Sequence, residues 1–365
     1  MAKGADNNSN AAGGRAEAAG GNYETLVASW YCVRLLAGAA GEPPADLPAN
    51  VRLLSVRCQT EAPVDDVLVE TSAGGFVFVQ AKRSIDLSSS ETSQLASVLD
   101  EFIRQFKASA DAQQGYRWSR PLDADRDRLV LTTPSSSSSK ITQTLPKLLR
   151  AVWEQAGAET LSDVQTSAVD REVASIVEAH ISRIWTATYG APPTRADIGR
   201  LLRLVRVQVL DVEAEGRDRT TALDLLRGTI LAQPDAARTA WSSIVEFCGR
   251  LRGESSGAHG PSLQKILIDA GVGLLAAPDY RPDIEALRTW TQARLARTPA
   301  FTRLIEERPE TRIERSISAS LRAAAEEDRF WWLVNPAPAK VACATNWRMS
   351  FSSLDAMLCS FPLTS

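Results

Sequence analysis

Two short apolar segments carry polar side chains of the kinds that bind metal ions and activate water. Asp65 and Asp66 come directly before the segment VLVE, and Gln80 and Lys82 end the segment FVFVQAK. The residues TSAGG between the segments favour a hairpin of two antiparallel strands. An antiparallel partner brings the start of one strand against the end of the other, and alternation puts Gln80 and Lys82 on one face. Carboxylate, amide and ammonium groups are therefore expected to converge.

These groups suit a hard divalent cation. Mg²⁺ takes oxygen ligands from one or two carboxylates and keeps several waters. Asp66 would supply the carboxylate, and the side-chain oxygen of Gln80 would bind the metal or hold one of its waters. Lys82 would orient or deprotonate the attacking water and stabilise the charge that develops on phosphorus. The pattern predicts phosphodiester hydrolysis with Mg²⁺ or Mn²⁺ as the cofactor.

Each of these residues also has a purely structural interpretation. Lys82 could end its strand in a stabilising ion pair with Asp65 or Asp66, and Gln80 could be a core amide with satisfied hydrogen bonds. FVFVQAK is apolar on both faces, which indicates a central strand, where a lysine without a partner or a use is costly. We favour the catalytic interpretation of Lys82. Asp65 and Asp66 point to opposite faces, and we choose Asp66, which abuts the strand core, although the turn does not fix the register.

The surrounding pattern predicts the elements that must position these side chains. Helical spacing of apolar residues begins at Asn22 and ends near Gly38, and Ser residues cap a second amphipathic helix within 86–109. Residues 1–21 are expected to be a disordered arm because they hold little to bury. The predicted strands are 51–58, 67–70, 76–82 and 126–133. Residues 140 to about 328 read as consecutive helices, so we expect an α/β domain (22–137), with a mixed sheet flanked by helices, and then an all-α domain (138–328).

These elements resemble the PD-(D/E)xK, or restriction-endonuclease-like, superfamily in its variant with Q-x-K. The closer resemblance is to the double-stranded DNA endonuclease domain at the N-terminus of bacterial antiphage effectors, including those of CBASS and of nuclease-NTPase defence proteins. The matching segments are NYETLVASWYCVRLL, EAPVDDVLVE, FVFVQAK and RLVLTT, which span about a third of the chain.

The resemblance implies a role for each matching residue. Asp66 and Gln80 would lie at the metal, Lys82 would be the catalytic lysine, and Glu24 on the first helix would be an accessory acid. A glutamate in the first turn of a helix also interacts favourably with the helix dipole, which is the structural alternative for Glu24. The implied partner is double-stranded DNA.

Composition narrows the remaining classes of function. The formal net charge of -3 argues against binding nucleic acid by bulk positive charge, so any contact must be local. We hypothesise that a homo-oligomer supplies a second binding face. Five cysteines without a CxxC pair, and only two histidines, argue against a Cys/His metal cage and against His-dependent hydrolysis. With no signal peptide and no membrane-spanning segment, we expect free thiols and a cytoplasmic location.

Two alternatives to the DNA endonuclease stay open. The first is a non-catalytic scaffold that uses a nuclease fold to bind a partner, and the second is an RNase or single-strand nuclease on the same fold. Within the helical part, the arginines of TRADIGRLLRLVRVQVL could form a phosphate-contacting stripe, although a solvated helix face is favoured for Arg195, Arg200, Arg203 and Arg206.

The last 37 residues, 329–365, differ in character from the helical pattern before them, with paired Trp and two Cys in a short span. Codons permitted for Arg329 to Cys343, read from the third base of each, allow the string G-x-x-x-x-G-K-S after an apolar strand. That string is the phosphate-binding loop of P-loop NTPases. It leads to the hypothesis of an aberrant, frameshifted tail, with a P-loop NTPase and a sensor region in the intact protein.

Overall fold

A six-stranded mixed sheet lies at the centre of the computed structural model, which describes residues 7–38, 43–111 and 115–275, with residues 7–20 described by their backbone alone. The strand order is β5-β4-β3-β2-β1-β6. β1, β2 and β3 pair antiparallel in chain order, β3, β4 and β5 run parallel, and β6 pairs antiparallel with β1. The strands are β1 (Leu53–Cys58), β2 (Val67–Thr71), β3 (Phe76–Ala81), β4 (Arg128–Thr133), β5 (Val205–Val209) and β6 (Gly257–His259).

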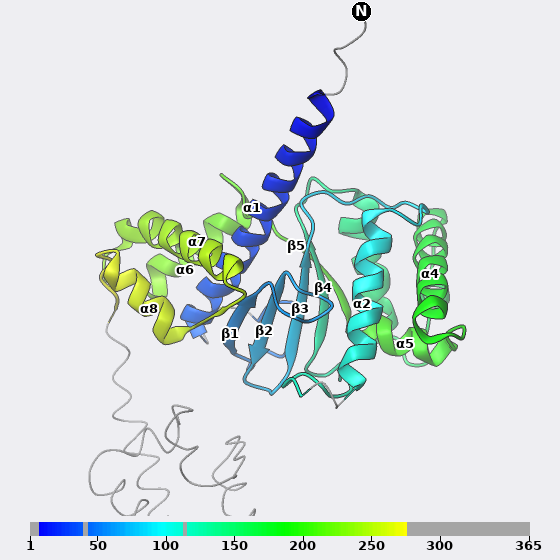
Figure 1. The fold of residues 1–365 in the computed structure, drawn as a ribbon. Helices are drawn as coiled ribbons and strands as arrows, with labels where there is room; N and C mark the ends of the chain where they lie inside the picture. Colours follow the sequence, from blue (N-terminus) through cyan, green and yellow to red (C-terminus); the bar gives the residue numbers. More distant parts are fainter. Residues whose placement is uncertain (1–6, 39–42, 112–114, 276–365) are drawn as a thin grey trace, which may run out of the picture. The chain divides into compact units, whose positions relative to one another are not determined.

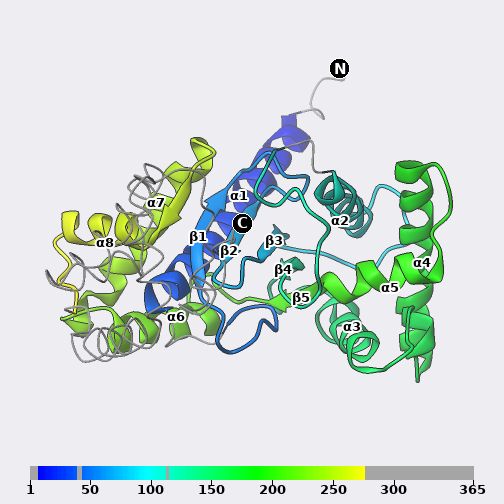
Figure 2. The ribbon, with the colours of Figure 1, turned by 90° about the horizontal axis from the view of Figure 1, so that it is seen from below.

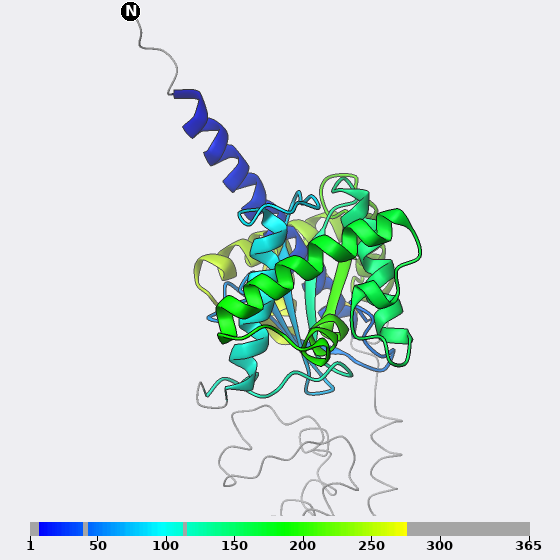
Figure 3. The same cartoon turned by 90° about the vertical axis from the view of Figure 1, so that its right-hand side faces the viewer.

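Helices cover both faces of this sheet (Figure 1). One group packs on one face of the sheet and the other group on the opposite face, and the view from below shows them on either side of the strands (Figure 2). The first group is α1 (Asn7–Ala37), α6 (Arg217–Thr229), α7 (Ala237–Gly253) and α8 (Gly260–Asp269). The second is α2 (Gln94–Ala110), α3 (Leu145–Glu154), α4 (Ala168–Tyr189) and α5 (Arg195–Leu204), whose packing is seen side-on in Figure 3. Short helical turns occupy Lys140–Thr144, Leu161–Asp163 and Pro234–Ala236.

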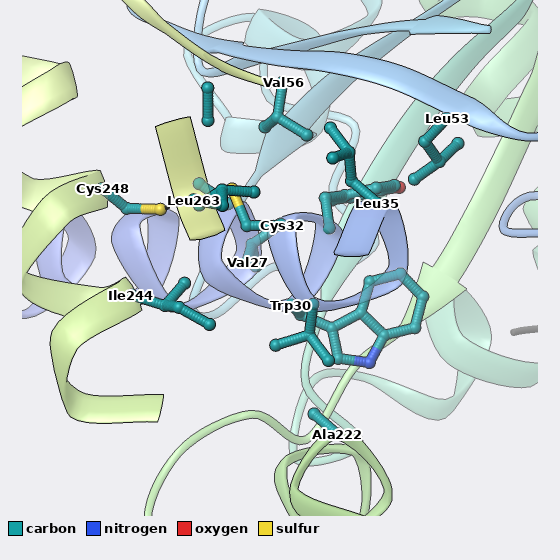
Figure 4. Packing of buried hydrophobic residues seen from close by; sticks show 14 of the residues in the cluster. Val27, Trp30, Cys32, Leu35, Leu53, Val56, Ala222, Ile244, Cys248 and Leu263 are labelled. Carbon is teal, nitrogen blue, oxygen red and sulfur yellow. Dashed lines mark hydrogen bonds between the residues drawn. The ribbon is translucent and has the colours of Figure 1, made fainter. Parts of the chain in front are cut away.

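Side-chain alternation on β3 divides the interior into two cores. Val77 and Val79 point to the core under α1, and Phe76 and Phe78 point to the core under α2. Figure 4 shows the first core, in which Cys32 of α1 faces α7. All six residues of β3 are buried, because helices cover both of its faces. The prediction that this strand is central in the sheet is therefore confirmed.

The sequence correctly predicts β1 to β4, the end of α1 and most of α2. The disordered arm expected for 1–21 is wrong for the described residues, since α1 begins at Asn7. The expected all-helical remainder is also wrong, because β5 and β6 both come from it and join the sheet. Residues 1–275 accordingly form one compact unit, without a division at 137/138. The rest of the helical prediction, and the P-loop hypothesis for 329–365, lie outside the described residues.

The segment TRADIGRLLRLVRVQVL, predicted to be helical throughout, contains the end of a helix and the start of β5. α5 ends at Leu204, and Val205 adopts an extended conformation with φ -76° and ψ 134°. From there the chain continues as the strand VRVQV, so the helical stripe stops at Arg203. Arg195 and Arg200 form ion pairs with acidic neighbours on the surface. The four arginines do not share one face, and Arg206 is buried on β5.

Two further expectations can be compared with the described part. No helix there is long and apolar enough to span a bilayer. Cys32, Cys58 and Cys248 are buried free thiols, as expected from the cysteine pattern, with 3.6 Å between the sulfur atoms of Cys32 and Cys248. Cys343 and Cys359 lie outside the described residues.

Asp127 ties the hairpin turn to the strand that follows α2. Its carboxylate is fully buried and accepts hydrogen bonds from the backbone N–H of Phe76 (2.8 Å) and of Asp123 (2.8 Å). Arg120 adds a two-pronged contact at 2.6 and 2.9 Å. The turn packs closely here, since a side chain at Gly75 would lie 2.0 Å from the carbonyl oxygen of Arg126. Asp127 thereby fixes the start of β3, and with it the direction of the strand that carries Gln80 and Lys82.

We expect Asp127→Ala to lower the free energy of unfolding by about 3–5 kcal/mol, because it leaves two buried N–H groups and one guanidinium without their acceptor. Asp125 lies two residues earlier and is exposed, so Asp125→Ala is the matched control and should change stability by less than about 0.5 kcal/mol. Urea unfolding followed by circular dichroism measures both values. Equal midpoints for the two variants would contradict the role given to Asp127.

Candidate active site

The strand register brings Asp66 to the end of β3. Val67 pairs with Val79, so Asp66 lies next to Gln80 at the open end of the hairpin. Its Oδ2 accepts a hydrogen bond of 2.8 Å from the backbone N–H of Ala81, the residue between Gln80 and Lys82. Asp66 is only 7% exposed, whereas Asp65 is half-buried. The structure therefore places the carboxylate of Asp66 directly at the Q-x-K segment.

Gln80 and Lys82 continue the alternation of β3 on the face covered by α2. Gln80 is 2% exposed, and its Oε1 has no hydrogen-bond partner among the described residues. The satisfied core amide considered for Gln80 is thus not what the structure shows. Lys82 is half-buried, and its backbone N–H donates to the carbonyl of Thr132 (2.9 Å). Within the described part, no carboxylate lies within the 4.0 Å ion-pair distance of the Lys82 ammonium.

The environment of Asp66 opposes ionisation of its carboxyl group. Burial raises the pKa of Asp66 from 3.8 to about 7, and the charges of Glu24 and Asp65 act in the same direction. The charge of Lys82 and the hydrogen bond from Ala81 lower this pKa and offset part of the effect. The Asp66 carboxyl group therefore titrates near neutral pH, as perturbed groups at functional sites often do.

Glu101 on α2 is a fourth polar group of this site, and the sequence did not indicate it. α2 starts after the N-cap Ser93, and Glu101 on it lies within electrostatic range of Lys82 and Asp65. Ser97 donates to Oε1 of Glu101 (3.1 Å), while Oε2 is buried and has no hydrogen-bond partner among the described residues. Burial raises the pKa of Glu101, and the charge of Lys82 lowers it. Lys82 therefore interacts electrostatically with Asp66 and with Glu101.

One contact of α2 holds the acidic segment beside this helix. Gln105 is fully buried, and its Oε1 accepts a hydrogen bond of 3.4 Å from the backbone N–H of Val64. The Gln105 amide nitrogen donates in turn to Ser109 (2.9 Å). Val64 precedes Asp65 and Asp66, so this contact fixes the approach of the chain to β2.

Glu24 lies near the site but has a partner of its own. Oε2 of Glu24 is 2.7 Å from Nη2 of Arg252 on α7, in an ion pair. The charge of Glu24 nevertheless raises the pKa of Asp66. The structure thus places Glu24 within electrostatic range of Asp66. The helix-dipole alternative for Glu24 is wrong, because α1 begins at Asn7 and Glu24 lies in the middle of the helix, so the ion pair with Arg252 is the structural reason for an acid at position 24.

The oxygen atoms at this site suit a hard cation. Asp66 offers a carboxylate, and Gln80 and Glu101 each have a buried oxygen without a hydrogen-bond partner among the described residues. Buried polar atoms are rarely left without partners, so these two oxygens fit an oxygen-ligated ion such as Mg²⁺. The described residues hold no group of three or more His, Cys, Asp or Glu side chains arranged for a metal. Bound water or a substrate phosphate would therefore have to complete the coordination.

Comparisons with known proteins give only a weak likeness. No protein-family model and no curated protein matches the chain. Among solved structures, it is similar to the Acinetobacter baumannii Cap4 SAVED/CARF-domain containing receptor, alone and with the cyclic trinucleotide 3'3'3'-cAAA or 2'3'3'-cAAA. The identity is 13% and the TM-score 0.37, over 69% of this chain and 44–47% of the receptor chains. The chain thus spans less than half the length of those receptors, and a TM-score of 0.37 assigns neither a fold family nor a function to it.

We expect Asp66→Asn to stabilise the metal-free protein at pH 8. The carboxyl pKa is raised on folding from 3.8 to about 7, so the cost of burying its charge is absent below about pH 4 and complete above about pH 7. The asparagine keeps an acceptor for the Ala81 N–H without a charge. The gain is at most about 4 kcal/mol, because each tenfold change in proton affinity is about 1.4 kcal/mol.

Urea unfolding in EDTA at pH 8 and pH 5 measures this difference. The advantage of the Asn variant should be largest at pH 8 and should shrink at pH 5, where wild-type Asp66 is protonated. Asp86→Asn, at an exposed position beyond β3, is the control and should show no such trend. An Asn variant that is less stable than wild type at pH 8 would contradict the electrostatics described here.

Proposed function

We propose that this protein is a metal-dependent endonuclease that hydrolyses phosphodiester bonds of double-stranded DNA, as a module of a bacterial antiphage defence protein. One observation carries the proposal. The buried carboxylate of Asp66 is bound to the N–H between Gln80 and Lys82, and the buried Gln80 oxygen has no partner. A satisfied core amide would not leave the Gln80 oxygen without a partner, whereas a metal ion or a metal-bound water would give this oxygen one.

Each residue then has a defined task. Asp66 and Gln80 would hold Mg²⁺ or Mn²⁺, and Glu101 would complete the set directly or through a water. When bound, the metal would supply charge for the phosphate oxygens and lower the pKa of a water. Lys82 has no carboxylate within 4.0 Å in the described part, so its ammonium is available to orient that water or to stabilise charge on phosphorus. Asp66 must lose its proton before it binds the metal.

The arrangement of elements around the site supports the resemblance seen in the sequence. An antiparallel hairpin, β2 and β3, is followed by α2 and then by β4, which is parallel to β3. α1 covers the opposite face of the same strands. This order of a first helix, three strands, a crossover helix and a fourth strand is the one that the nuclease resemblance implies. The antiphage setting rests on that resemblance alone.

Lys82→Ala is the variant that tests the proposed nuclease activity most directly. We expect this variant to lose plasmid cleavage by at least about 100-fold, because general acid–base and charge-stabilising groups contribute effects of that size. Lys265 on α8 pairs with an exposed acid, so Lys265→Ala is the matched control and should keep full activity. Supercoiled plasmid, Mg²⁺ or Mn²⁺, and EDTA as a blank give the readout on the 365-residue chain.

The same assay separates the alternatives. Cleavage of single strands or RNA in preference to duplex DNA would identify the other nuclease class. A Lys82→Ala protein that keeps a wild-type melting temperature and the cleavage rate of wild type would exclude the catalytic role. An absence of cleavage by the wild type on any of the three substrates with either metal would favour the non-catalytic scaffold.

Glu101 gives a separate prediction, because the resemblance does not implicate it. Glu101→Gln keeps the Ser97 contact but removes a charge, so we expect a higher Mg²⁺ requirement, by about 10-fold or more, as for lost metal-site partners. Glu172 forms an exposed ion pair with Lys140, and Glu172→Gln should leave the Mg²⁺ titration unchanged. If the Mg²⁺ titration of Glu101→Gln overlays that of wild type, Glu101 takes no part in the metal site.

A further inference from the structure

A cavity of about 330 Å³ lies at the free edge of the sheet, beside β5. Its walls come from α1, from the segment 43–46, from α3 and from β5, and Asp218 of α6 also lines it. Arg206 and Gln208 reach it from the face of β5 that is turned to α1, because they pair in register with Val130 and Thr132. The site of Asp66 and Lys82 is on the face covered by α2, so the cavity is separate from it.

Arg206 is a buried cation with spare donors in the cavity wall. It is 6% exposed, and its Nη1 donates to the carbonyls of Arg203 (2.9 Å) and Val205 (2.8 Å). Nε forms an ion pair of 3.3 Å with Asp46. The remaining group, Nη2, is buried and has no hydrogen-bond partner among the described residues. The guanidinium also lies 5.3 Å from the centre of the Trp153 ring. A guanidinium N–H without an acceptor is costly in the interior, so Nη2 is a donor that a ligand oxygen would satisfy.

Cations outnumber anions around Arg206. Burial and the charges of Arg128 and Arg150 together lower its pKa to about 10, against the opposing effect of Asp46. Asp46 is also shared, since Arg150 lies 3.8 Å from its other oxygen. The second carboxylate of the wall, Asp218, already accepts the backbone N–H of Asp211 and a contact from Arg217. The Asp46 carboxylate is therefore shared between the guanidinium groups of Arg206 and Arg150, and the charge of a third cation, Arg128, also acts on Arg206.

The segment that closes the cavity is held in place by the third of these cations. Ala45 and Asp46 have positive φ angles of 57° and 54°, a conformation that costs energy in residues other than glycine. Arg128 is 1% exposed and donates to the carbonyl oxygens of both residues, each at 3.0 Å. The hydrogen bonds from the buried Arg128 thus hold Ala45 and Asp46 in a backbone conformation that these residues do not favour by themselves.

The other walls add a planar surface and further donors. Arg34 stacks 4.1 Å above the ring of Trp30, and both line the cavity. Oε1 of Gln208 accepts the hydroxyl of Tyr31 (2.7 Å), which turns the amide NH₂ of Gln208 into the group available for a ligand. Guanidinium forks with amide donors match the oxygens of a phosphate group.

We propose that this cavity binds a small phosphorylated molecule, with its phosphate on Arg206 and Arg150. A volume of about 330 Å³ is at the small end of ligand pockets and admits one phosphate ester but not a duplex. The proposal does not depend on nuclease activity, because it uses none of the residues assigned to the metal site.

Calorimetry on the 365-residue chain in EDTA tests the proposal. Sodium phosphate and adenosine 5′-monophosphate are the two probes, and a short DNA duplex is the third arm. Arg150 is largely exposed, and its one ion pair with a described residue is the long contact with Asp46, so Arg150→Ala should fold. We expect wild type to bind at least one of the first two probes, and Arg150→Ala to bind it about tenfold more weakly or worse. Arg206→Lys, which keeps the charge but loses the fork, should weaken it as well.

Arg250→Ala is the matched control, since Arg250 pairs with the exposed Glu246 on α7, and it should bind like wild type. Wild type that binds neither phosphate nor the mononucleotide at millimolar concentration would overturn the proposal. It would also fail if Arg150→Ala and Arg206→Lys, both with wild-type circular dichroism, bound the probes unchanged. If the duplex alone bound, and bound more weakly to Arg150→Ala, this edge would be a nucleic-acid contact instead.

Discussion

The buried carboxylate of Asp66 is the constraint on which the rest of the site depends. A carboxyl group that is 7% exposed is costly to ionise, and Glu24 and Asp65 add to the cost. Only the charge of Lys82 and the N–H of Ala81 act in the opposite direction. An apolar residue at the start of β2 would pack there without any of these costs. An acid with a pKa of about 7 at this point is a group of the kind that is often found at functional sites.

Local patterns were enough to predict the elements that carry this acid. Alternation and turn residues identified the hairpin, and helical spacing identified α1 and α2. β5 was missed because Leu201, Leu202 and Leu204 continue the helical spacing directly into VRVQV, where Val205, Val207 and Val209 already alternate with polar residues. These five residues alternate apolar and polar side chains, as a strand does, but so short an alternation is weaker evidence than the helical spacing that precedes it. β6 is the tripeptide GAH, which has no local signal and forms only because β1 offers a free edge.

The site could be predicted only where its residues share one local element. Asp66, Gln80 and Lys82 follow from strand alternation and a hairpin. Glu101 is different, because it reaches the site through the packing of α2 on the sheet. Within its helix it lies four residues before Gln105, and Ser109 follows four residues later, so the three form one polar line beside the apolar residues of the buried face. That spacing is a usable signal in retrospect. Arg252, by contrast, meets Glu24 across two helices that are distant in sequence, and no local pattern connects them.

One row of the sheet connects the two regions where cations and acids gather. Ala81, whose N–H holds Asp66, pairs in register with Thr132, and Thr132 pairs with Gln208 in the cavity wall. Lys82 adds a backbone hydrogen bond to the Thr132 carbonyl. Two strand spacings, about 10 Å, separate Ala81 from Gln208, but the side chains of the two regions project from opposite faces. A single ligand therefore cannot contact both Lys82 and Arg206. An anion in the cavity could therefore act on the proposed metal site only through the field of its charge or through a shift of the backbone of β4 and β5.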